Sequence, residues 1–227
     1  MNTNLLFFSL FVLLGCTKKM EQPTISNSDQ PILTYLALGD SYTIGESVTA
    51  SESFPYQFAA QLKAQQLNLT TPKIIAKTGW TTDELQAAIK AENLTQTFDF
   101  VTLLIGVNNQ YRGYSKVTYR KEFKELLQTA IGFAGGNKKR VFVLSIPDWG
   151  VTPFGLSSGK NKKEIADEID AFNAINKEET LAQEVSYTDI TPASRNAASD
   201  LSLVAKDGLH YSGKMHLQWA AAIPISR

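Results

Sequence analysis

The residues best suited to chemistry are a serine, an aspartate and a histidine that lie far apart in the chain. Ser41 follows an apolar run directly, in Gly39-Asp40-Ser41, and Asp207 lies three residues before His210. A serine hydroxyl is a poor nucleophile until a base takes its proton. His210 is the natural base, and Asp207 can reach back to its imidazole, fix the tautomer and stabilise the imidazolium. The three residues together suit nucleophilic catalysis.

Each of these residues also has an ordinary structural interpretation. Gly, Asp and Ser are common turn residues, and Asp207-Gly208 alone would indicate a turn or a helix cap. Asp40 is expected to bond turn amides rather than to take part in catalysis. His216, the second of the two histidines, is expected to be a helix residue with no chemical task. The position of the residues relative to the predicted strands has to decide between these alternatives.

Strand and helix patterns alternate from Pro31 onward. Strands are predicted at residues 32–38, 73–76, 98–106, 140–147 and 185–190, and helices at residues 54–67, 81–92, 117–134, 162–184 and from Gly213. In the second helix, Thr81 and Glu84 have the spacing of a capping box. This alternation predicts an α/β fold, a flavodoxin-like doubly wound parallel sheet of five strands with helices on both faces.

Polar residues and glycines follow the predicted strands. In a doubly wound sheet, ligands bind beyond the carboxyl ends of the strands. The residues found there are Ser41 after the first strand, Gly79 after the second, Asn108 after the third, Asp148 after the fourth, and Asp207 with His210 beyond the fifth. The sequence therefore predicts that a serine, an aspartate–histidine pair and several hydrogen-bond donors lie at one edge of the sheet.

This set of residues resembles the SGNH hydrolases, also called GDSL-type esterases and lipases. The resemblance extends from Ile32 to Trp219 and has four blocks in order. The blocks are Gly39-Asp40-Ser41 followed by Tyr42, Thr43 and Gly45; Gly79; Gly106 to Asn108; and Asp207 with His210. Two positions depart from the family pattern: Tyr42 stands where the family name has Leu, and Asn109 stands where the family often has Asp.

The resemblance implies a serine esterase that forms an acyl-enzyme on Ser41, with His210 as general base and acid and Asp207 as its partner. It implies an oxyanion hole made by the backbone N–H groups of Ser41 and Gly79 and the side-chain amide of Asn108. Gly79 has a physical reason to be glycine, because a substrate carbonyl can approach its N–H. Neither a metal nor a cofactor is expected. The substrates would be small esters such as acetylated carbohydrates or lysophospholipids.

Five residues near the predicted strand ends are candidates for substrate binding: Tyr42, Trp80, Asn109, Arg112 and Asp148. Arg112 would meet a polar or anionic head group, although a solvated loop is an equal alternative. Asp148 would either close its loop or line the pocket. Trp80 and Trp149 are either core residues or pocket walls. Specificity is expected to depend on residues 44–53, 108–116 and 148–161.

The N-terminus predicts export and lipidation. An apolar run from Leu5 to Leu14 is too short to span a bilayer but fits the apolar region of a signal peptide. The run ends in Leu-Leu-Gly-Cys16, which resembles the bacterial lipobox, although no Lys or Arg precedes it. We expect a signal peptide at residues 1–15, acylation of Cys16, a flexible tether at residues 16–30 and the hydrolase domain at residues 31–227. A plain signal peptide is the alternative.

This N-terminus would tether the protein to a membrane of the bacterial cell envelope. The 22 Lys and Arg residues balance 22 Asp and Glu residues, so no basic excess indicates a nucleic-acid partner. Two histidines and one cysteine argue against a multi-ligand metal site. A monomer is expected.

Two other functions remain open. One is a lipid-anchored binding module that has kept the fold and lost the chemistry. The other is a flavin-binding protein, because residues 77–82, KTGWTT, resemble the phosphate loop of flavodoxins. Flavodoxins, however, hold that loop after the first strand, and a flavin would leave Ser41, Asn108 and the Asp207–His210 pair unexplained.

Overall fold

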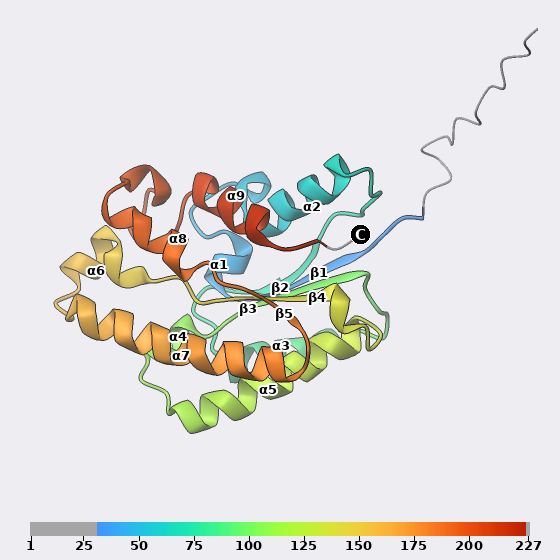
Figure 1. Cartoon of the computed structure of the whole chain (residues 1–227), viewed down its shortest axis with the longest axis horizontal. Coiled ribbons are helices and arrows are strands. Elements are labelled where there is room, and N and C mark those ends of the chain that lie inside the picture. The colour runs from blue at the N-terminus through green and yellow to red at the C-terminus, as the bar shows by residue number, and fades with distance from the viewer. Residues whose placement is uncertain (1–30, 226–227) are drawn as a thin grey trace, which may run out of the picture. The chain divides into compact units, whose positions relative to one another are not determined.

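The computed structural model describes residues 31–225, and these residues form an α/β fold around one parallel sheet (Figure 1). The strands are β1 (Tyr35–Gly39), β2 (Lys73–Ala76), β3 (Phe100–Leu104), β4 (Val141–Leu144) and β5 (Ser186–Thr188). Their order is β2-β1-β3-β4-β5, and every neighbouring pair is parallel. The chain therefore reverses its direction of winding between β1 and β3, which is the place where doubly wound sheets bind ligands. The flavodoxin-like prediction is confirmed.

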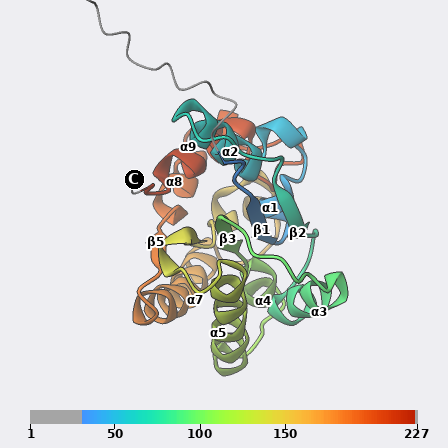
Figure 2. The same cartoon turned by 90° about the vertical axis from the view of Figure 1, so that its right-hand side faces the viewer.

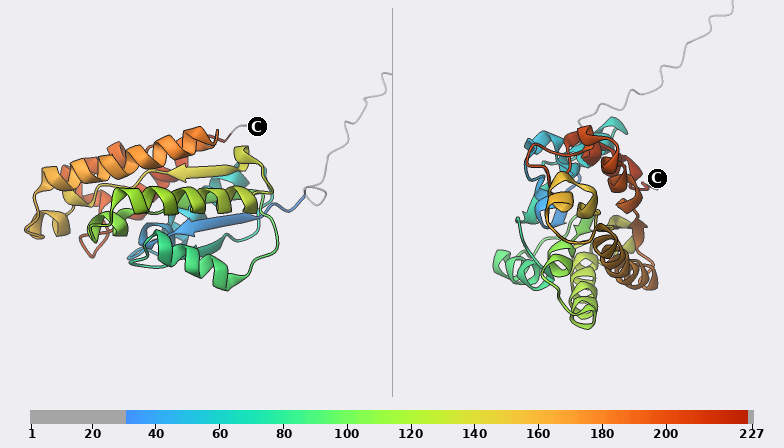
Figure 3. Two further views of the ribbon diagram at one scale, coloured as in Figure 1. Left: turned by 90° about the horizontal axis from the view of Figure 1, so that it is seen from below. Right: turned by 90° about the vertical axis from the view of Figure 1, so that its left-hand side faces the viewer.

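Helices cover both faces of the sheet, as predicted (Figure 2). One face carries α2 (Phe54–Ala64) and α9 (Gly213–Ala222), which pack against each other. The other face carries α3 (Thr82–Glu92), α5 (Lys116–Phe133) and α7 (Lys162–Ala182). Figure 3 shows the long helices α5 and α7 running along the sheet. The sheet is therefore screened from solvent on both sides.

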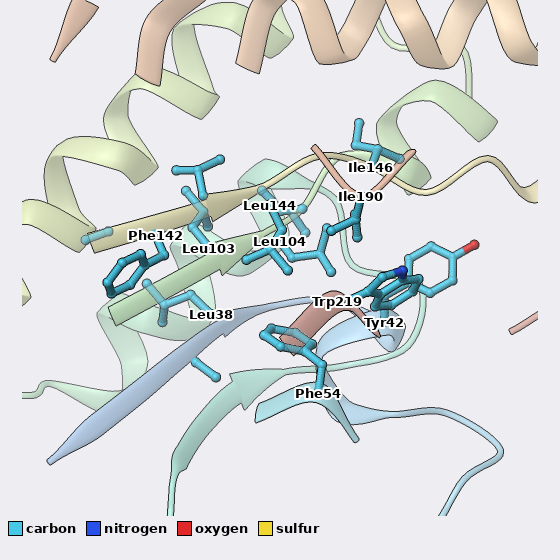
Figure 4. Packing of buried hydrophobic residues seen from close by; sticks show 14 of the residues in the cluster. Leu38, Tyr42, Phe54, Leu103, Leu104, Phe142, Leu144, Ile146, Ile190 and Trp219 are labelled. Atoms are coloured by element: carbon cyan, nitrogen blue, oxygen red, sulfur yellow. The ribbon is translucent and has the colours of Figure 1, made fainter. Parts of the chain in front are cut away.

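The central strands are buried along their whole length. All five residues of β1 and all four of β4 are buried, which explains why these strands are continuous apolar runs rather than alternating ones. Leu38 and Leu103 of the sheet are completely inaccessible, and so are Phe54 of α2 and Trp219 of α9 (Figure 4). Burial of each such side chain contributes about 1.5–3 kcal/mol. This core holds the strand ends in register.

The strands and helices begin and end close to the predicted residues. The predicted strand at residues 98–106 is shorter in the structure, because Ile105 and Gly106 leave the ladder to start the next helix. The capping box at α3 is present, and the Thr81 backbone N–H donates to Glu84 Oε2 at 2.9 Å. Helix α5 ends before Gly135, whose φ of 63° is left-handed.

Four short helices escaped prediction. They are α1 (Ser41–Ile44), α4 (Val107–Tyr111), α6 (Pro153–Ser157) and α8 (Thr191–Arg195), and each has only four or five residues. One turn of helix is too short to show an apolar periodicity. These helices matter because the first two start immediately beyond the central strands β1 and β3.

The predictions for the N-terminus, residues 1–15, Cys16 and the tether at residues 16–30, lie outside the described residues. Within residues 31–225, no helix combines the length and the apolar character that crossing a membrane requires.

His216 joins α9 to α2 through a buried hydrogen bond. Its Nδ1 atom accepts a hydrogen bond from the backbone N–H of Phe54 at 3.0 Å. Its ring stacks on Trp219, with 4.7 Å between the ring centroids. Burial lowers the pKa of His216 to about 3, with a smaller contribution from His210. His216 is therefore a neutral packing residue, in keeping with the expectation from the sequence.

Replacement of His216 by asparagine should change how stability depends on pH. The unfolded protein binds a proton at His216 near pH 6.5, whereas the folded protein binds it only near pH 3. The contribution of neutral His216 to the free energy of unfolding is therefore fully present above pH 6.5. It is lost as the pH falls from about 6.5 towards about 3. Between neutral pH and roughly pH 4.5, the wild type should lose about 2 kcal/mol more than His216→Asn. Urea unfolding of both proteins measures this difference.

The side-chain oxygen of asparagine at position 216 can still accept the hydrogen bond from the backbone N–H of Phe54. The comparison of wild type with His216→Asn therefore isolates the titration of the imidazole. Asp40, which also titrates, is unchanged in both proteins. A stability difference that does not vary with pH would show that His216 does not titrate differently on folding.

Candidate active site

A cavity of about 220 Å³ lies at the carboxyl edge of the sheet. It is lined by segments that follow different strands, and the lining residues are Ser41, Tyr42, Thr78, Gly79, Val107, Asn108, Tyr111, Trp149, Phe154, Leu209 and His210. Four residues singled out in the sequence for catalysis therefore share one cavity: Ser41, Gly79, Asn108 and His210. Asp207 contacts the cavity through His210.

Ser41 is presented by a tight turn between β1 and α1. A side chain at Gly39 would place a Cβ 2.1 Å from Thr43 Oγ1 and 2.3 Å from the Leu104 carbonyl oxygen, so only glycine fits. Asp40 caps α1, and its Oδ1 accepts from the Tyr42 backbone N–H at 3.0 Å. This contact is the structural role expected for Asp40. Ser41 is then the first residue of α1, where its own N–H has no partner within the helix.

The carboxyl group of Asp40 is itself buried beneath this turn. Burial raises the pKa of Asp40 to about 7, although the hydrogen bond from Tyr42 N–H lowers it. Among the described residues, none makes a hydrogen bond to Asp40 Oδ2. Asp40 therefore titrates near neutral pH, one residue away from Ser41.

Asp207 and His210 form a close pair on one turn. Asp207 Oδ2 lies 2.5 Å from His210 Nδ1, and Asp207 Oδ1 accepts from the backbone N–H groups of Leu209 and His210, each at 2.9 Å. Burial raises the pKa of Asp207, but the hydrogen bonds from His210, Leu209 and Ser47 outweigh it and hold the pKa well below its ordinary value. The carboxylate therefore stays ionised and selects the tautomer of His210 with a proton on Nδ1.

His210 and Ser41 meet at the cavity without a hydrogen bond between their side chains in the described part of the chain. His210 is 8% exposed, and the ring of Tyr42 packs edge-on against it at 5.6 Å. Hydrogen bonds between nucleophile and base are often long without substrate and tighten when it binds. Tyr42, one of the predicted substrate-binding residues, does line the cavity and also supports the histidine.

Gly79 and Asn108 place two further donors around the cavity. Gly79 has a left-handed φ of 86°, which a residue with a side chain adopts only with strain. Asn108 lies on α4, and its Nδ2 donates to the Trp80 carbonyl oxygen at 2.9 Å. An amide nitrogen has two protons, so one N–H of Asn108 remains for a ligand.

Arg112 and Trp80 hold the loop of Gly79 instead of lining the cavity. Arg112 Nη2 donates to the Gly79 carbonyl oxygen at 2.6 Å, and Arg112 Nη1 lies 3.4 Å from Glu84. The carbonyl oxygen of Trp80 accepts from Asn108. Two consecutive carbonyl groups of this loop are thus tied to α4. In the structure both residues shape this loop, and their contact with substrate stays a prediction.

Asn109 points away from the cavity, contrary to its prediction as a substrate-binding residue. It is completely buried, and its Oδ1 accepts from the Thr82 backbone N–H at 3.1 Å while its Nδ2 donates to Thr82 Oγ1 at 2.7 Å. These bonds join α4 to the first turn of α3. Asn108 and Asn109 therefore point in different directions from one short helix, because adjacent helical positions differ by about 100°.

Asp148 also lies outside the cavity lining. Its side chain is 2% exposed, and its Oδ2 accepts from Arg195 Nε at 2.9 Å. Its Oδ1 accepts from the Gly150 backbone N–H at 2.9 Å. Of the two roles considered from the sequence, closing a loop and lining the pocket, the structure shows the first.

An apolar wall was largely missed in the sequence. Val107, Tyr111, Phe154 and Leu209 line the cavity with Trp149, and only Trp149 had been considered as a wall. The rings of Tyr111 and Trp149 lie 5.3 Å apart. The missed residues come from one-turn helices and from a loop, which carry no periodic pattern.

Metal ligands do not gather in the described part of the chain, where no group of three or more His, Cys, Asp or Glu side chains could hold an ion.

The model of a family described as GDSL-like lipase/acylhydrolase matches residues 37–217. The chain belongs to this family. The match includes every block of the resemblance, from Gly39 to His210. As a GDSL-like lipase/acylhydrolase, the protein is a carboxylic ester hydrolase. No curated protein sequence shows a significant match to the chain.

Solved structures share this fold. The acetylxylan esterase Axe2 from Geobacillus stearothermophilus has a TM-score of 0.65 at 18% identity, over 84% of this chain and 91% of that chain. A lipase/acylhydrolase from Enterococcus faecalis has a TM-score of 0.61 at 17% identity, over 86% and 99%. The esterase EstA from Pseudoalteromonas sp., in a structure inhibited by monoethylphosphonate, has a TM-score of 0.60 at 14% identity, over 83% and 93%. At these identities the likeness establishes the fold alone.

Proposed function

We propose that this hydrolase cleaves carboxylic esters through an acyl-enzyme on Ser41, with His210 as general base and acid and Asp207 as its orienting partner. The observation that carries the proposal is the Asp207–His210 pair, 2.5 Å apart, beside the cavity that Ser41 lines. Because Nδ1 of His210 is engaged by Asp207, its Nε2 atom is the one available to Ser41.

In the first half-reaction, His210 Nε2 takes the proton of Ser41 Oγ as the oxygen attacks the ester carbonyl carbon. The tetrahedral intermediate collapses when the imidazolium gives this proton to the leaving alcohol, which leaves an acyl group on Ser41. Water, deprotonated by the same nitrogen, then attacks the acyl-enzyme and releases the acid. Asp207 stays ionised throughout and stabilises the imidazolium, which agrees with its lowered pKa.

The negative charge on the carbonyl oxygen requires donors that are already in place. We propose that the backbone N–H groups of Ser41 and Gly79 and Nδ2 of Asn108 supply them. Ser41 N–H has no partner within its helix because Ser41 is the first residue of α1, and the loop of Gly79 is held by Arg112. A hole built from fixed backbone needs little reorganisation during the reaction, so it favours the transition state.

Substitution of Ser41 by alanine should abolish ester hydrolysis without unfolding the protein. We expect a loss in kcat on the order of 10⁴- to 10⁶-fold with p-nitrophenyl butyrate, because the attacking oxygen is gone. A fluorophosphonate probe should label the wild type and leave Ser41→Ala unlabelled, as mass spectrometry of the intact protein would show. Thermal melting should be nearly the same for both.

Retention of most activity by Ser41→Ala would contradict this mechanism. A wild type that neither turns over esters nor reacts with the probe would indicate the lipid-anchored binding module instead. A yellow purified protein would indicate a bound flavin.

The wall of the cavity favours an apolar acyl group as the substrate moiety held there. Val107, Trp149, Phe154 and Leu209 line it together with Tyr111, and a space of about 220 Å³ exceeds what an acetyl group needs. A carbohydrate would instead need several polar side chains around its hydroxyl groups. We propose a monomeric enzyme that accepts lysophospholipids or other acyl esters in preference to acetylated sugars.

Activity should therefore rise with acyl length before it falls. With p-nitrophenyl esters, kcat/KM should be highest for chains of about four to eight carbons and roughly tenfold lower for acetate. Phe154→Ala should lower kcat/KM for the longer chains more than for acetate, because Phe154 forms part of the wall. Leu201→Ala is a matched control, since Leu201 is exposed and outside the cavity lining. Equal effects of Phe154→Ala on all chain lengths would contradict this assignment.

We propose in addition that Cys16 carries the lipid and that residues 16–30 tether the hydrolase domain to a membrane of the bacterial cell envelope. The support is the Leu-Leu-Gly-Cys sequence at the end of an apolar run and the fact that Cys16 is the one cysteine of the chain. Several acyl chains on one residue give lasting attachment.

Cys16→Ser should abolish lipid attachment in a bacterial host. Cells fed an alkyne fatty acid should label the wild-type protein, and the label should disappear with Cys16→Ser, because the acylated thiol is missing. Ester hydrolysis per molecule should be unchanged, since residue 16 lies before the family match. Equal labelling of both proteins would contradict the proposal.

A further inference from the structure

The turn that follows the Ser41 helix has an unusual backbone. Gly45 caps α1 in the left-handed conformation, with a φ of 75°, and Ser47 also has a left-handed φ, of 66°. Glycine adopts this conformation freely, but serine does so with strain. Strained residues persist where surrounding contacts hold them, and they concentrate at functional sites. Ser47 therefore needs a contact that accounts for its conformation.

That contact is with the carboxylate of the aspartate–histidine pair. Ser47 Oγ donates to Asp207 Oδ2 at 2.7 Å, across 160 positions of sequence. Oδ2 is also the oxygen that pairs with His210 Nδ1, whereas Oδ1 accepts from two backbone N–H groups. Both oxygens of Asp207 thus accept two hydrogen bonds each, and among residues 31–225 Ser47 is the one donor to Asp207 from outside its own turn.

We propose that Ser47 is a positioning residue of the catalytic site, whose hydroxyl holds the carboxylate of Asp207 in place for His210. The proposal rests on the proposed function, because it acts through the same pair. Ser47 itself does not line the cavity, and no hydrogen bond joins it to Ser41 in the described structure.

The hydrogen bond has two physical effects on the pair. It fixes the plane of the carboxylate, so that Oδ2 stays directed at Nδ1. It also takes up part of the negative charge on Oδ2, which weakens the attraction of Asp207 for a protonated imidazole. Without Ser47, the carboxylate would bind the imidazolium more strongly and orient it less well. The acidic limb of the pH profile of kcat/KM would then move to a higher pH.

Glu46, the residue before Ser47, holds the same turn through a contact with a different loop. Thr78 Oγ1 donates to the carboxylate of Glu46, and Thr78 lines the cavity immediately before Gly79. Glu46 and Ser47 therefore reach two different loops, one that carries Gly79 and one that carries Asp207. These opposed contacts explain how the strained backbone of Ser47 is maintained.

Other ionisable groups surround the pair and must be considered in a pH profile. They are Asp40 before α1, Tyr42 on α1, Glu52 in the 3₁₀ turn Ala50–Glu52, His216 on α9, Asp148 beyond β4, and Lys206 beside Asp207. Burial keeps Tyr42 neutral by raising its pKa, and burial keeps His216 neutral by lowering its pKa. Asp40, with a pKa of about 7, does titrate in the relevant range, but it makes no hydrogen bond to Ser47. A difference between wild type and a Ser47 variant therefore reports on Asp207 and His210.

The test compares the pH dependence of kcat/KM in Ser47→Ala, Ser47→Gly and wild type. Both variants lack the hydroxyl, and Ser47→Gly in addition relieves the backbone strain, so it should fold at least as stably as the wild type. We expect both to lose about tenfold in kcat/KM at neutral pH, with the acidic limb moved about half a pH unit higher. Ser51→Ala is the matched control, because Ser51 is an exposed serine of the same loop whose hydroxyl makes a hydrogen bond with Thr49 instead of Asp207.

Each outcome distinguishes the two proposals. Profiles of Ser47→Gly and wild type that superimpose would overturn the role of Ser47 and leave the esterase mechanism intact. A shift in Ser47→Ala that is absent in Ser47→Gly would assign the effect to backbone strain and would also overturn it. Activity that survives in Ser41→Ala, measured alongside, would instead show that the proposed mechanism fails.

Discussion

A parallel sheet brings the carboxyl ends of all its strands to one edge, and the rest of this molecule depends on that constraint. The reversal of winding between β1 and β3 sends the helices that follow these two strands to opposite faces of the sheet. A space for ligands is therefore expected at the carboxyl ends of β1 and β3, which are adjacent. The buried core of the sheet fixes the position of each strand end. Ser41 and Asn108 reach the same cavity because they lie in the first turns of the helices that follow two neighbouring strands.

Precision at this edge comes from short helices that are tied to their neighbours. Helix α4 is the clearest case, because its polar residues and its C-cap residue Arg112 bind three other segments. Asn108 and Arg112 bind consecutive carbonyl groups in the Gly79 loop, Asn109 binds Thr82, and Gln110 accepts from the Trp149 indole at 2.8 Å. A single turn of helix has little stability of its own. Here its hydrogen bonds to three other segments hold it in place.

The turn after α1 likewise contacts several segments through a few residues. Gly45, Glu46 and Ser47 end the helix that carries Ser41 and reach the loops of Thr78 and Asp207. Ser41 as the proposed nucleophile, the proposed oxyanion loop and the aspartate–histidine pair are therefore linked through three consecutive residues. Strain at Ser47 is tolerated because the contacts on both sides of it are specific.

Much of this arrangement was predictable, because it depends on local patterns. Apolar runs that alternate with amphipathic segments predicted the five strands and the long helices, and the spacing of Thr81 and Glu84 predicted a helix start that the structure confirms. The order of the polar residues at strand ends predicted which side chains would share an edge. These properties are encoded within about twenty residues of chain, so no long-range contact is needed to recognise them.

The direction of the side chains beside those strand ends depends on tertiary contacts that the sequence patterns do not show. Asn109 and Asp148 were candidates for substrate binding and are instead buried in hydrogen bonds to Thr82 and Arg195. Tyr111 and Phe154 form part of the cavity wall, whereas the sequence had indicated only the loops that contain them. Orientation on a one-turn helix changes by about 100° from one residue to the next and depends on partners elsewhere in the chain. The fold and the family could be predicted from the sequence alone. The hydrogen bond between Ser47 and Asp207, 160 positions apart, exists only once the chain has folded.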